Sequence, residues 1–319
     1  ILLSLTLGRY PLSLLDWGHF LLAELDLETL PAERFDLLHN LMVNIRLPRV
    51  LAAVLVGAAL STSGAAYQAV FRNPLVSPGL MGVLAGASFG AALGLLISGN
   101  WLLTQLLSFV MGMLAVVIGL GIANLFGGAS IVMLVLGGVI SGALFSSLLS
   151  IVKYVADPYN QLPAIVYWLM GSLAQAELHQ TGWLALPMLL GIAVLIGMGR
   201  ALDAMAMGDD EARSLGVPIA AVRYGVIAAA TLISALTVSI AGMIGWVGLI
   251  IPHIARLIVG SGNRRLLPVS ACLGAIFLLA CDALARTLTT TEIPIGIVTE
   301  LLGIPVFLLV LHRVRRGWT

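Results

Sequence analysis

Charged residues are scarce in this chain. Only 10% of its 319 residues are Asp, Glu, Lys or Arg, against roughly 25% in a soluble globular domain. Apolar residues make up 60%, so the chain lacks the polar surface that a water-soluble fold needs. A net charge of +1 gives no reason to expect a nucleic-acid partner. The composition therefore predicts an all-α, polytopic membrane protein.

Catalytic and metal-binding motifs are also missing. The two cysteines, Cys272 and Cys281, are nine residues apart in one apolar run, a poor spacing for a disulfide within a helix. The sequence has no HExxH, no GxSxG and no phosphate-binding loop, and its five histidines are scattered. His253 and Arg256 share a helix face, but no nucleophile or carboxylate motif lies nearby, which favours a structural histidine. We expect no cofactor on this chain and no ATP hydrolysis by it.

Apolar runs of about 20 residues, the length needed to cross a bilayer, recur through the chain. They predict ten spans if residues 1–8 are the remnant of a first helix whose N-terminal part is missing. The other nine are placed at about 48–71, 79–98, 101–125, 131–154, 183–199, 219–241, 243–260, 267–287 and 294–312. The apolar piece at 161–173 is too short and is predicted as a partial or re-entrant helix. The whole chain, 1–319, is read as one transmembrane domain.

Lysine and arginine set the expected orientation, because they concentrate on the cytoplasmic side. With ten spans both termini lie on the same side. That side carries ten basic residues: Arg72, Arg200, Arg213, Arg223, Arg256, Arg264, Arg265, Arg313, Arg315 and Arg316. The opposite side carries six: Arg9, Arg34, Arg46, Arg49, Lys153 and Arg286. Both termini are therefore predicted to be cytoplasmic.

One dense charged cluster interrupts the apolar middle of the chain, within a loop at about 203–218 on the predicted cytoplasmic side. Asp209 or Asp210 can cap a short helix, Glu211 suits its first turn and Arg213 its last. Gly216 supplies a left-handed stop, and Pro218 can begin the next helix. A compact capped helix between two spans is a plausible handle for a soluble partner.

Two segments should break the helical pattern. Residues 71–79 contain two prolines and a glycine, and residues 241–256 contain three glycines and Pro252 within an apolar run. Discontinuous helices at matching places in two halves are typical of transporters. Here 48–98 and 219–285 both follow the order of span, break and span, which is a weak indication of a repeat.

A few polar residues in or beside the spans are candidates for function. Arg46 and Arg49 flank the outer mouth of the second span and are expected to be exposed and unpaired within the local sequence. They either reach lipid phosphate or receive acidic side chains of an external protein. Arg286 lies four residues after Asp282, which also suits a simple salt bridge. Glu300 is an acid within the last span. The run 131–154 has a face of small residues, suited to helix packing, a dimer seam or a weakly polar path.

The motifs together resemble the permeases of the iron-siderophore, haem and cobalamin uptake family, the type II ABC importers. The match runs from Leu41 to Arg313. It rests on the order and spacing of several blocks: Arg46-Leu-Pro-Arg49; Gly64, Gln68 and Arg72-Asn-Pro-Leu75; Pro78, Gly82 and Gly86-Ala87; Trp168-Leu-Met-Gly171-Ser172; Gly208, Glu211-Ala-Arg213 and Leu215-Gly216; Gly242, Gly245-Trp-Val-Gly248, Pro252-His253 and Arg256; Arg265-Leu-Leu-Pro268; Asp282 and Arg286; Pro294-Ile-Gly296; and Gly303-Ile-Pro305-Val-Phe307. Trp246 stands where a Phe is commoner.

The resemblance implies a type II importer permease fold with ten spans in a bacterial cytoplasmic membrane. It also implies a second copy of the chain, two cytoplasmic ATPases that hold ATP and Mg, and a periplasmic binding protein. The loop that seats on the ATPase would be Gly208, Asp209, Asp210, Glu211, Ala212, Arg213, Leu215 and Gly216. Arg46, Arg49 and Arg286 would receive acids of the binding protein. The inner gate would begin at Ser130, Ile131 and Val132, and the pathway would include Gly138 and Ser141.

The function expected from these observations is import of a metal chelate, driven by ATP hydrolysis on partner subunits. One alternative keeps the class and changes the cargo to an oxyanion such as molybdate. A secondary transporter is a second alternative, but it would need an embedded relay of ionisable residues that the sequence lacks. An intramembrane enzyme built on His253 is a third, and it lacks a nucleophile.

Overall fold

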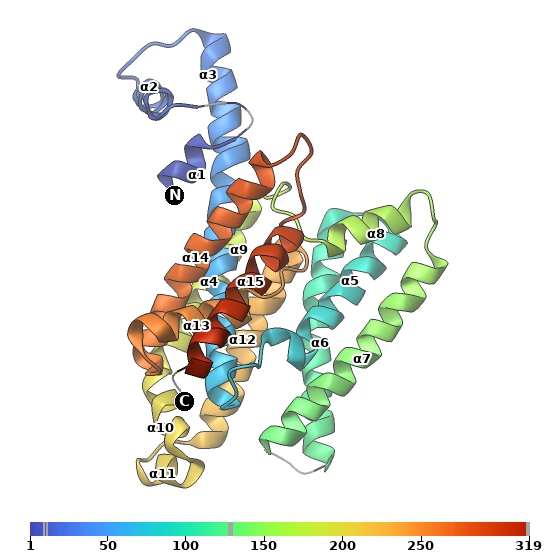
Figure 1. Cartoon of the computed structure of the whole chain (residues 1–319). Helices are drawn as coiled ribbons and strands as arrows, with labels where there is room; N and C mark the ends of the chain where they lie inside the picture. Colours follow the sequence, from blue (N-terminus) through green and yellow to red (C-terminus); the bar gives the residue numbers. More distant parts are fainter. Residues whose placement is uncertain (9, 11, 127–129, 317–319) are drawn as a thin grey trace.

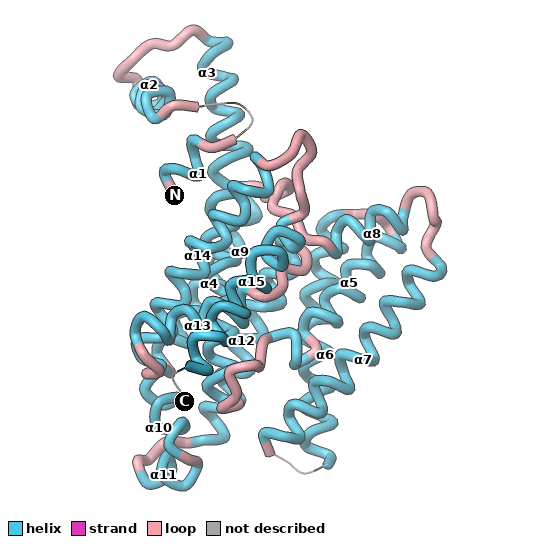
Figure 2. The backbone as a smooth tube through the Cα atoms, in the orientation of Figure 1, coloured by secondary structure: helices cyan, strands magenta, loops and turns pink. Residues whose placement is uncertain are grey.

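The computed structural model describes residues 1–8, 10, 12–126 and 130–316, and every regular element in that part is helical (Figure 2). The elements that match the predicted spans are α1 (Leu2–Thr6), α4 (Leu47–Val70), α5 (Val83–Ile97), α6 (Trp101–Phe126), α7 (Ile131–Val155), α9 (Leu178–Gly197), α12 (Ile219–Ala241), α13 (Val247–Val259), α14 (Asn263–Thr287) and α15 (Ile295–Arg316). Arg9 lies outside the described residues, as do the side chains of Arg313, Arg315 and Arg316.

Length and hydropathy support a multi-pass membrane protein. Within the described ranges, six helical segments are long and apolar enough to cross a membrane, and α5, α13 and α15 are shorter apolar helices. The remaining helices are α2 (Leu14–Glu24), α3 (Ala32–His39), η1 (Asn40–Arg46), η2 (Pro78–Met81), α8 (Gln161–Leu169), α10 (Gly199–Met207) and α11 (Asp209–Ser214). The nine-residue α8 is the short helix predicted at 161–173.

The helical rod that contains α4 begins earlier than its apolar run. Helices α3, η1 and α4 join without a break, so the rod runs from Ala32 to Val70. Glu33, Arg34 and Asp36 make its first turns polar, and hydropathy alone therefore placed the start near residue 48. The extension carries α2 and α3 away from the bundle at one end, opposite to α10 and α11 (Figure 1).

Helix α4 forms the centre of one group of helices, in contact with α9, α12, α13 and α14, while α5, α6 and α7 form a second group joined to it through α12 (Figure 1). Two glycines let backbones meet at this centre. A Cβ on Gly57 would lie 2.3 Å from the carbonyl oxygen of Gly274 in α14, and one on Gly64 would lie 1.9 Å from that of Gly248 in α13. Such close approach is how helices gain packing contacts where lipid supplies no hydrophobic driving force.

Both predicted helix breaks are present. After α4 the chain makes turns and then the 3-10 helix η2, which is followed by Gly82 with φ of 83°. After α12, residues 242–246 have no regular structure, and Trp246 holds φ of 67° at the start of α13. A positive φ is unfavourable for a tryptophan, so the surrounding packing must hold this turn.

Candidate functional site

The predicted coupling segment forms a short helix, α11, at the end of the molecule opposite to α2 (Figure 1). Its first turn holds Asp209, Asp210 and Glu211, and its last turn holds Arg213, as the helix dipole favours. The predicted capping differs in one respect. Gly208, with φ of 142°, is the N-cap and no side chain caps the helix, so neither aspartate has that role. Gly216 has the expected left-handed φ of 78°.

Asp209 fastens α11 to the bundle. Its carboxylate pairs with Arg72, just beyond α4, and accepts a hydrogen bond of 3.0 Å from Arg223 of α12. Ala212, on the same helix, is buried against the bundle. Asp209 and Ala212 therefore position the helix rather than present it to a partner.

Another set of residues in this segment faces outward. Asp210 and Arg213 pair with each other at 2.6 Å, yet their side chains are 91% and 64% exposed. Glu211 is exposed, and so are the apolar side chains of Met207 and Leu215. A fixed helix that shows charged and apolar groups to water has the composition of a small docking surface.

Partial burial of Asp209 opposes its ionisation, but Arg223 and Arg72 outweigh that effect and hold the pKa of Asp209 below its usual value of 3.8. The ion pairs thus stabilise the fold above that value and weaken only as the pH falls through the lowered pKa.

We expect amide hydrogen exchange in 209–214, corrected for intrinsic rates, to be unchanged between about pH 5 and pH 8. Asp209→Asn should speed this exchange, whereas Asp210→Asn, whose side chain faces water, should not; equal exchange in the two variants would contradict this role of Asp209.

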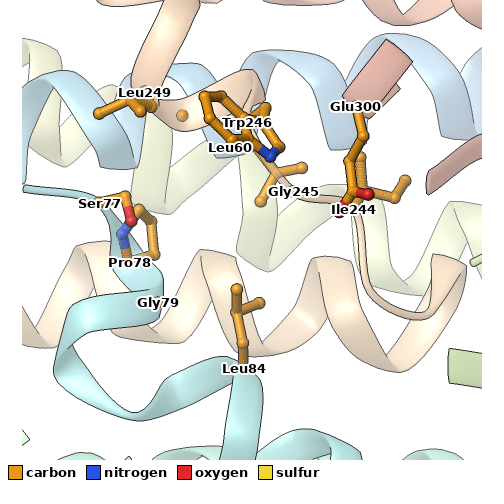
Figure 3. Close-up of a pocket in the computed structure, with 11 residues that line it drawn as sticks. Leu60, Ser77, Pro78, Gly79, Leu84, Ile244, Gly245, Trp246, Leu249 and Glu300 are labelled. Atoms are coloured by element: carbon orange, nitrogen blue, oxygen red, sulfur yellow. The ribbon is translucent and has the colours of Figure 1, made fainter. Parts of the chain in front are cut away.

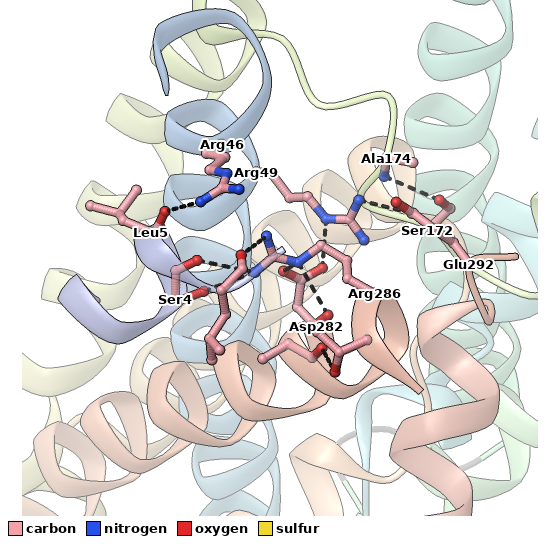
Figure 4. A network of polar contacts seen from close by, with 12 residues as sticks. Ser4, Leu5, Arg46, Arg49, Ser172, Ala174, Asp282, Arg286 and Glu292 are labelled. Carbon is pink, nitrogen blue, oxygen red and sulfur yellow. Dashed lines mark hydrogen bonds and ion pairs between the residues drawn. The ribbon is translucent and has the colours of Figure 1, made fainter. Parts of the chain in front are cut away.

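The arginines expected to receive an external protein lie at the other end of the molecule, near α1, and all three are buried. Figure 4 shows them with the residues that they contact. Arg46 donates hydrogen bonds to the carbonyl oxygens of Leu5, Thr6 and Tyr10. Arg286 donates to the carbonyl oxygens of Ser4 and Leu7. These contacts tie the segment around α1 to the end of η1, where α4 begins, and to α14.

Arg49 and Arg286 share the carboxylate of Asp282, which is fully buried. Arg49 Nε donates to Oδ1 at 2.7 Å, and Arg286 Nε lies 3.1 Å from Oδ2 as an ion pair. Arg49 Nη1 also donates to Glu292 at 2.8 Å, in the loop before α15. The expectation that Arg46 and Arg49 are exposed is therefore wrong. Neither has a partner in the local sequence, as expected, but acids and carbonyl groups distant in the sequence bind them. Their docking to an external protein stays a prediction.

The predicted gate and pathway residues separate into two groups. Ser130 precedes α7 and is exposed, Ile131 is partly buried and Val132 is 62% exposed, so these three are accessible. By contrast, Ser141 donates a 2.5 Å hydrogen bond to the carbonyl oxygen of Ala115 in α6. A Cβ on Gly138 would lie 2.5 Å from the carbonyl oxygen of Leu80. Gly138 and Ser141 therefore pack α7 against α6 and η2, and their place in the pathway stays a prediction.

The two helix breaks meet at a cavity of about 190 Å³ (Figure 3). Ser77, Pro78 and Gly79 line it from the first break, and Ile244, Gly245 and Trp246 line it from the second. Leu60 of α4, Leu84 of α5, Gly248 and Leu249 of α13 and Glu300 of α15 complete the lining. Discontinuous helices that meet beside a cavity are the arrangement that transporters use at their substrate paths.

His253 has a structural role. Its Nδ1 lies 2.7 Å from the carbonyl oxygen of Leu249, and its ring packs edge-on against Phe307 of α15. Among the described residues, no group of three His, Cys, Asp or Glu side chains could hold a metal ion.

Sequence reasoning missed three of the residues that complete these sites: Arg72, Arg223 and Glu292. A signal was available for the first two, since both are basic residues predicted on the same side of the membrane as the acids of α11. No comparable signal in the sequence pointed to Glu292, because its partner Arg49 is 243 positions away in the chain.

Comparison with known proteins places the chain in a family. Residues 1–313 match the model of the FecCD transport family. The molybdate import system permease protein MolB of Haemophilus influenzae is 39% identical, and the alignment covers 99% of this chain and 92% of MolB. The hemin transport system permease protein HmuU of Yersinia pestis is 37% identical, with 88% and 85% covered.

A solved structure shows the same architecture. An inward-facing metal-chelate type ABC transporter matches with a TM-score of 0.86 and 36% identity, over 98% of this chain and 94% of the solved one. The helical bundle, the two broken spans and these relationships agree. The chain belongs to the FecCD transport family and is a membrane-spanning permease component of an ABC transporter.

Proposed function

We propose that two copies of this chain form the translocation path of an importer that carries a metal chelate, such as a ferric siderophore, haem or cobalamin, from periplasm to cytoplasm. Two ATPase subunits that hold ATP and Mg dock on α11, and a periplasmic binding protein delivers the cargo at the opposite end. The complex lies in a bacterial inner membrane, with both termini in the cytoplasm.

The structure of α11 carries the ATPase part of this proposal. Asp209 fixes the helix to α4 and α12 through Arg72 and Arg223, while Asp210, Arg213 and Leu215 face outward. A push on the exposed face would therefore be transmitted to two membrane-spanning helices through ion pairs. Movement of the helix with ATP binding and hydrolysis would in turn open and close the path.

The test is binding of the ATPase that co-purifies with this permease. Leu215→Asp places a charge on the exposed face of the coupling segment and is expected to weaken ATPase binding at least about tenfold, because an apolar contact at the interface is replaced by a desolvated charge. Leu27→Asp makes the same change at a leucine near the opposite end of the molecule. The exposed fraction of Leu27 is 71% and that of Leu215 is 62%, and the Leu27 variant should leave ATPase binding unchanged.

Charge reversal gives a second variant for the same measurement. Arg213→Glu combined with Glu211→Arg keeps the net charge and inverts the pattern that the ATPase meets. We expect loss of co-purification and of uptake. Wild-type binding in both the Leu215→Asp protein and the charge-reversed protein would refute α11 as the docking site.

An oxyanion is the second candidate cargo. The observation in its favour is the 39% identity to the molybdate permease over 99% of this chain. Purifying the binding protein that associates with this permease and identifying its ligand separates the two: a metal chelate supports the first candidate and molybdate the second.

A further inference from the structure

One acid in the membrane part of the molecule has no role in the contacts described above. Glu300 lies on α15, and its carboxylate points toward Ile244 and Gly245 at the second helix break (Figure 3). Among the described residues, no hydrogen bond or ion pair is formed by this carboxylate. A Cβ placed on Gly245 would lie 3.5 Å from Glu300 Oε1 and within 4 Å of no other group.

Glu300 supplies the formal charge of the cavity. The other ten lining residues are apolar or carry neutral groups, such as the Ser77 hydroxyl. The cavity also meets the first turn of α13, which begins at Val247, and the positive end of a helix dipole favours an anionic neighbour. Glu300 is exposed in the single chain and also lines this cavity. An ionisable residue that faces a cavity in the membrane-spanning part of a protein marks a route for solutes.

We propose that Glu300 is a specificity-determining residue of the translocation path, which disfavours anionic solutes and admits neutral or cationic ones. The inference rests on the proposed function, because it assumes that the cavity between the two helix breaks belongs to the path. Two like charges within several Å repel strongly where protein and lipid lower the dielectric constant. A free oxyanion would be disfavoured here, and so would a chelate of net negative charge such as haem with its two propionates. Within the proposed class of cargo, the inference therefore selects neutral or cationic metal chelates.

The experiment measures the charge selectivity of the cavity without reference to any cargo. A cysteine is introduced by Gly245→Cys in a background with Cys272→Ser and Cys281→Ala, and the purified full-length permease in lipid is treated with cationic or anionic methanethiosulfonate reagents. Both reagents attack the thiolate, so the ratio of their rates cancels any influence of Glu300 on thiol ionisation. This ratio of cationic to anionic rates is divided by the same ratio measured for a small thiol in solution.

We expect the normalised cationic-to-anionic ratio to be at least about tenfold with Glu300 present and to fall toward one in the Glu300→Gln protein, since glutamine keeps the shape and removes the charge. Glu177→Gln serves as the control, because Glu177 is an exposed acid before α9 that does not line the cavity. This variant should keep the same normalised ratio as the protein in which Glu300 is unchanged. If Gly245→Cys prevents folding, Ser77→Cys places the reporter on the facing wall of the same cavity.

Equal ratios with and without the Glu300 charge would overturn the proposal, and so would a cysteine in the folded protein that neither reagent can reach. These failures differ from failure of the proposed function. An assembled importer that accumulates no chelate would contradict the function while the labelling ratio still shows the charge of Glu300. An active importer with an unselective cavity would contradict this inference alone.

Discussion

Replacing Asp282 with alanine is expected to lower the free energy of unfolding by about 3–5 kcal/mol. Its carboxylate is fully buried and lies between two buried guanidinium groups, 2.7 Å from Arg49 Nε and 3.1 Å from Arg286 Nε. Without it Arg286 loses its carboxylate partner and Arg49 keeps only Glu292. Unpaired charges inside a membrane protein repel each other and lack solvation, so the loss exceeds that of an ordinary ion pair.

Asp210→Ala is the matched control, because Asp210 also pairs with an arginine, Arg213 at 2.6 Å, but both side chains face water. Exposed pairs contribute little, and this variant should unfold almost as the wild type does. Reversible unfolding in mixed micelles measures both variants. A loss from Asp282→Ala no larger than that from Asp210→Ala would contradict the role of the buried network.

A methyl group on Gly64 should also be poorly tolerated. In Gly64→Ala the added Cβ would lie 1.9 Å from the carbonyl oxygen of Gly248, so α4 and α13 must move apart. Overpacking against backbone atoms typically costs 1–3 kcal/mol, and we expect about 3 kcal/mol here because no flexible side chain can yield. The separation would also widen the neighbouring cavity, since Gly248 lines it.

Gly182→Ala provides the comparison within another membrane-spanning helix. Gly182 lies in α9, and a Cβ there would meet nothing within 4 Å. Alanine has the higher helix propensity, so this variant should match the wild type or gain up to about 1 kcal/mol. The same unfolding measurement applies, and equal stability of Gly64→Ala and Gly182→Ala would show that α4 and α13 are not in close contact.

The spans could be predicted because lipid imposes a simple rule of length and polarity. The runs at 219–241 and 131–154 match α12 and α7 to within one residue. The rule fails where a helix continues into water. Helix α14 begins at Asn263 rather than near 267, because its first turn contains Arg264 and Arg265, and the polar α10 was not predicted.

The breaks were also visible in the sequence, since proline and glycine disrupt helices by local chemistry. Their meeting point was not visible. Pro78 and Gly245 line one cavity although 167 positions separate them, and periodicity gives no information on such distances. The outer arginines illustrate the same limit. Arg49 looked free because its partner Asp282 lies 233 positions away.

The short helix α11 could be predicted in outline, and its contacts show which of its residues hold it to the bundle. Charge density and the glycine at 216 indicated a short helix that faces the cytoplasm. Which acid holds the helix and which faces water depended on Arg72 and Arg223, whose approach is a tertiary feature. The structure assigns the first task to Asp209 and leaves Asp210 exposed.

We expect this permease to move its cargo only with energy from an ATPase that docks on α11. The most direct measurement is accumulation of a chelate in proteoliposomes that contain the permease, its co-purified ATPase and its binding protein, with and without ATP. We predict accumulation with ATP and Mg, and its loss in the Leu215→Asp protein. Accumulation driven by an ion gradient in the absence of the ATPase would contradict the claim.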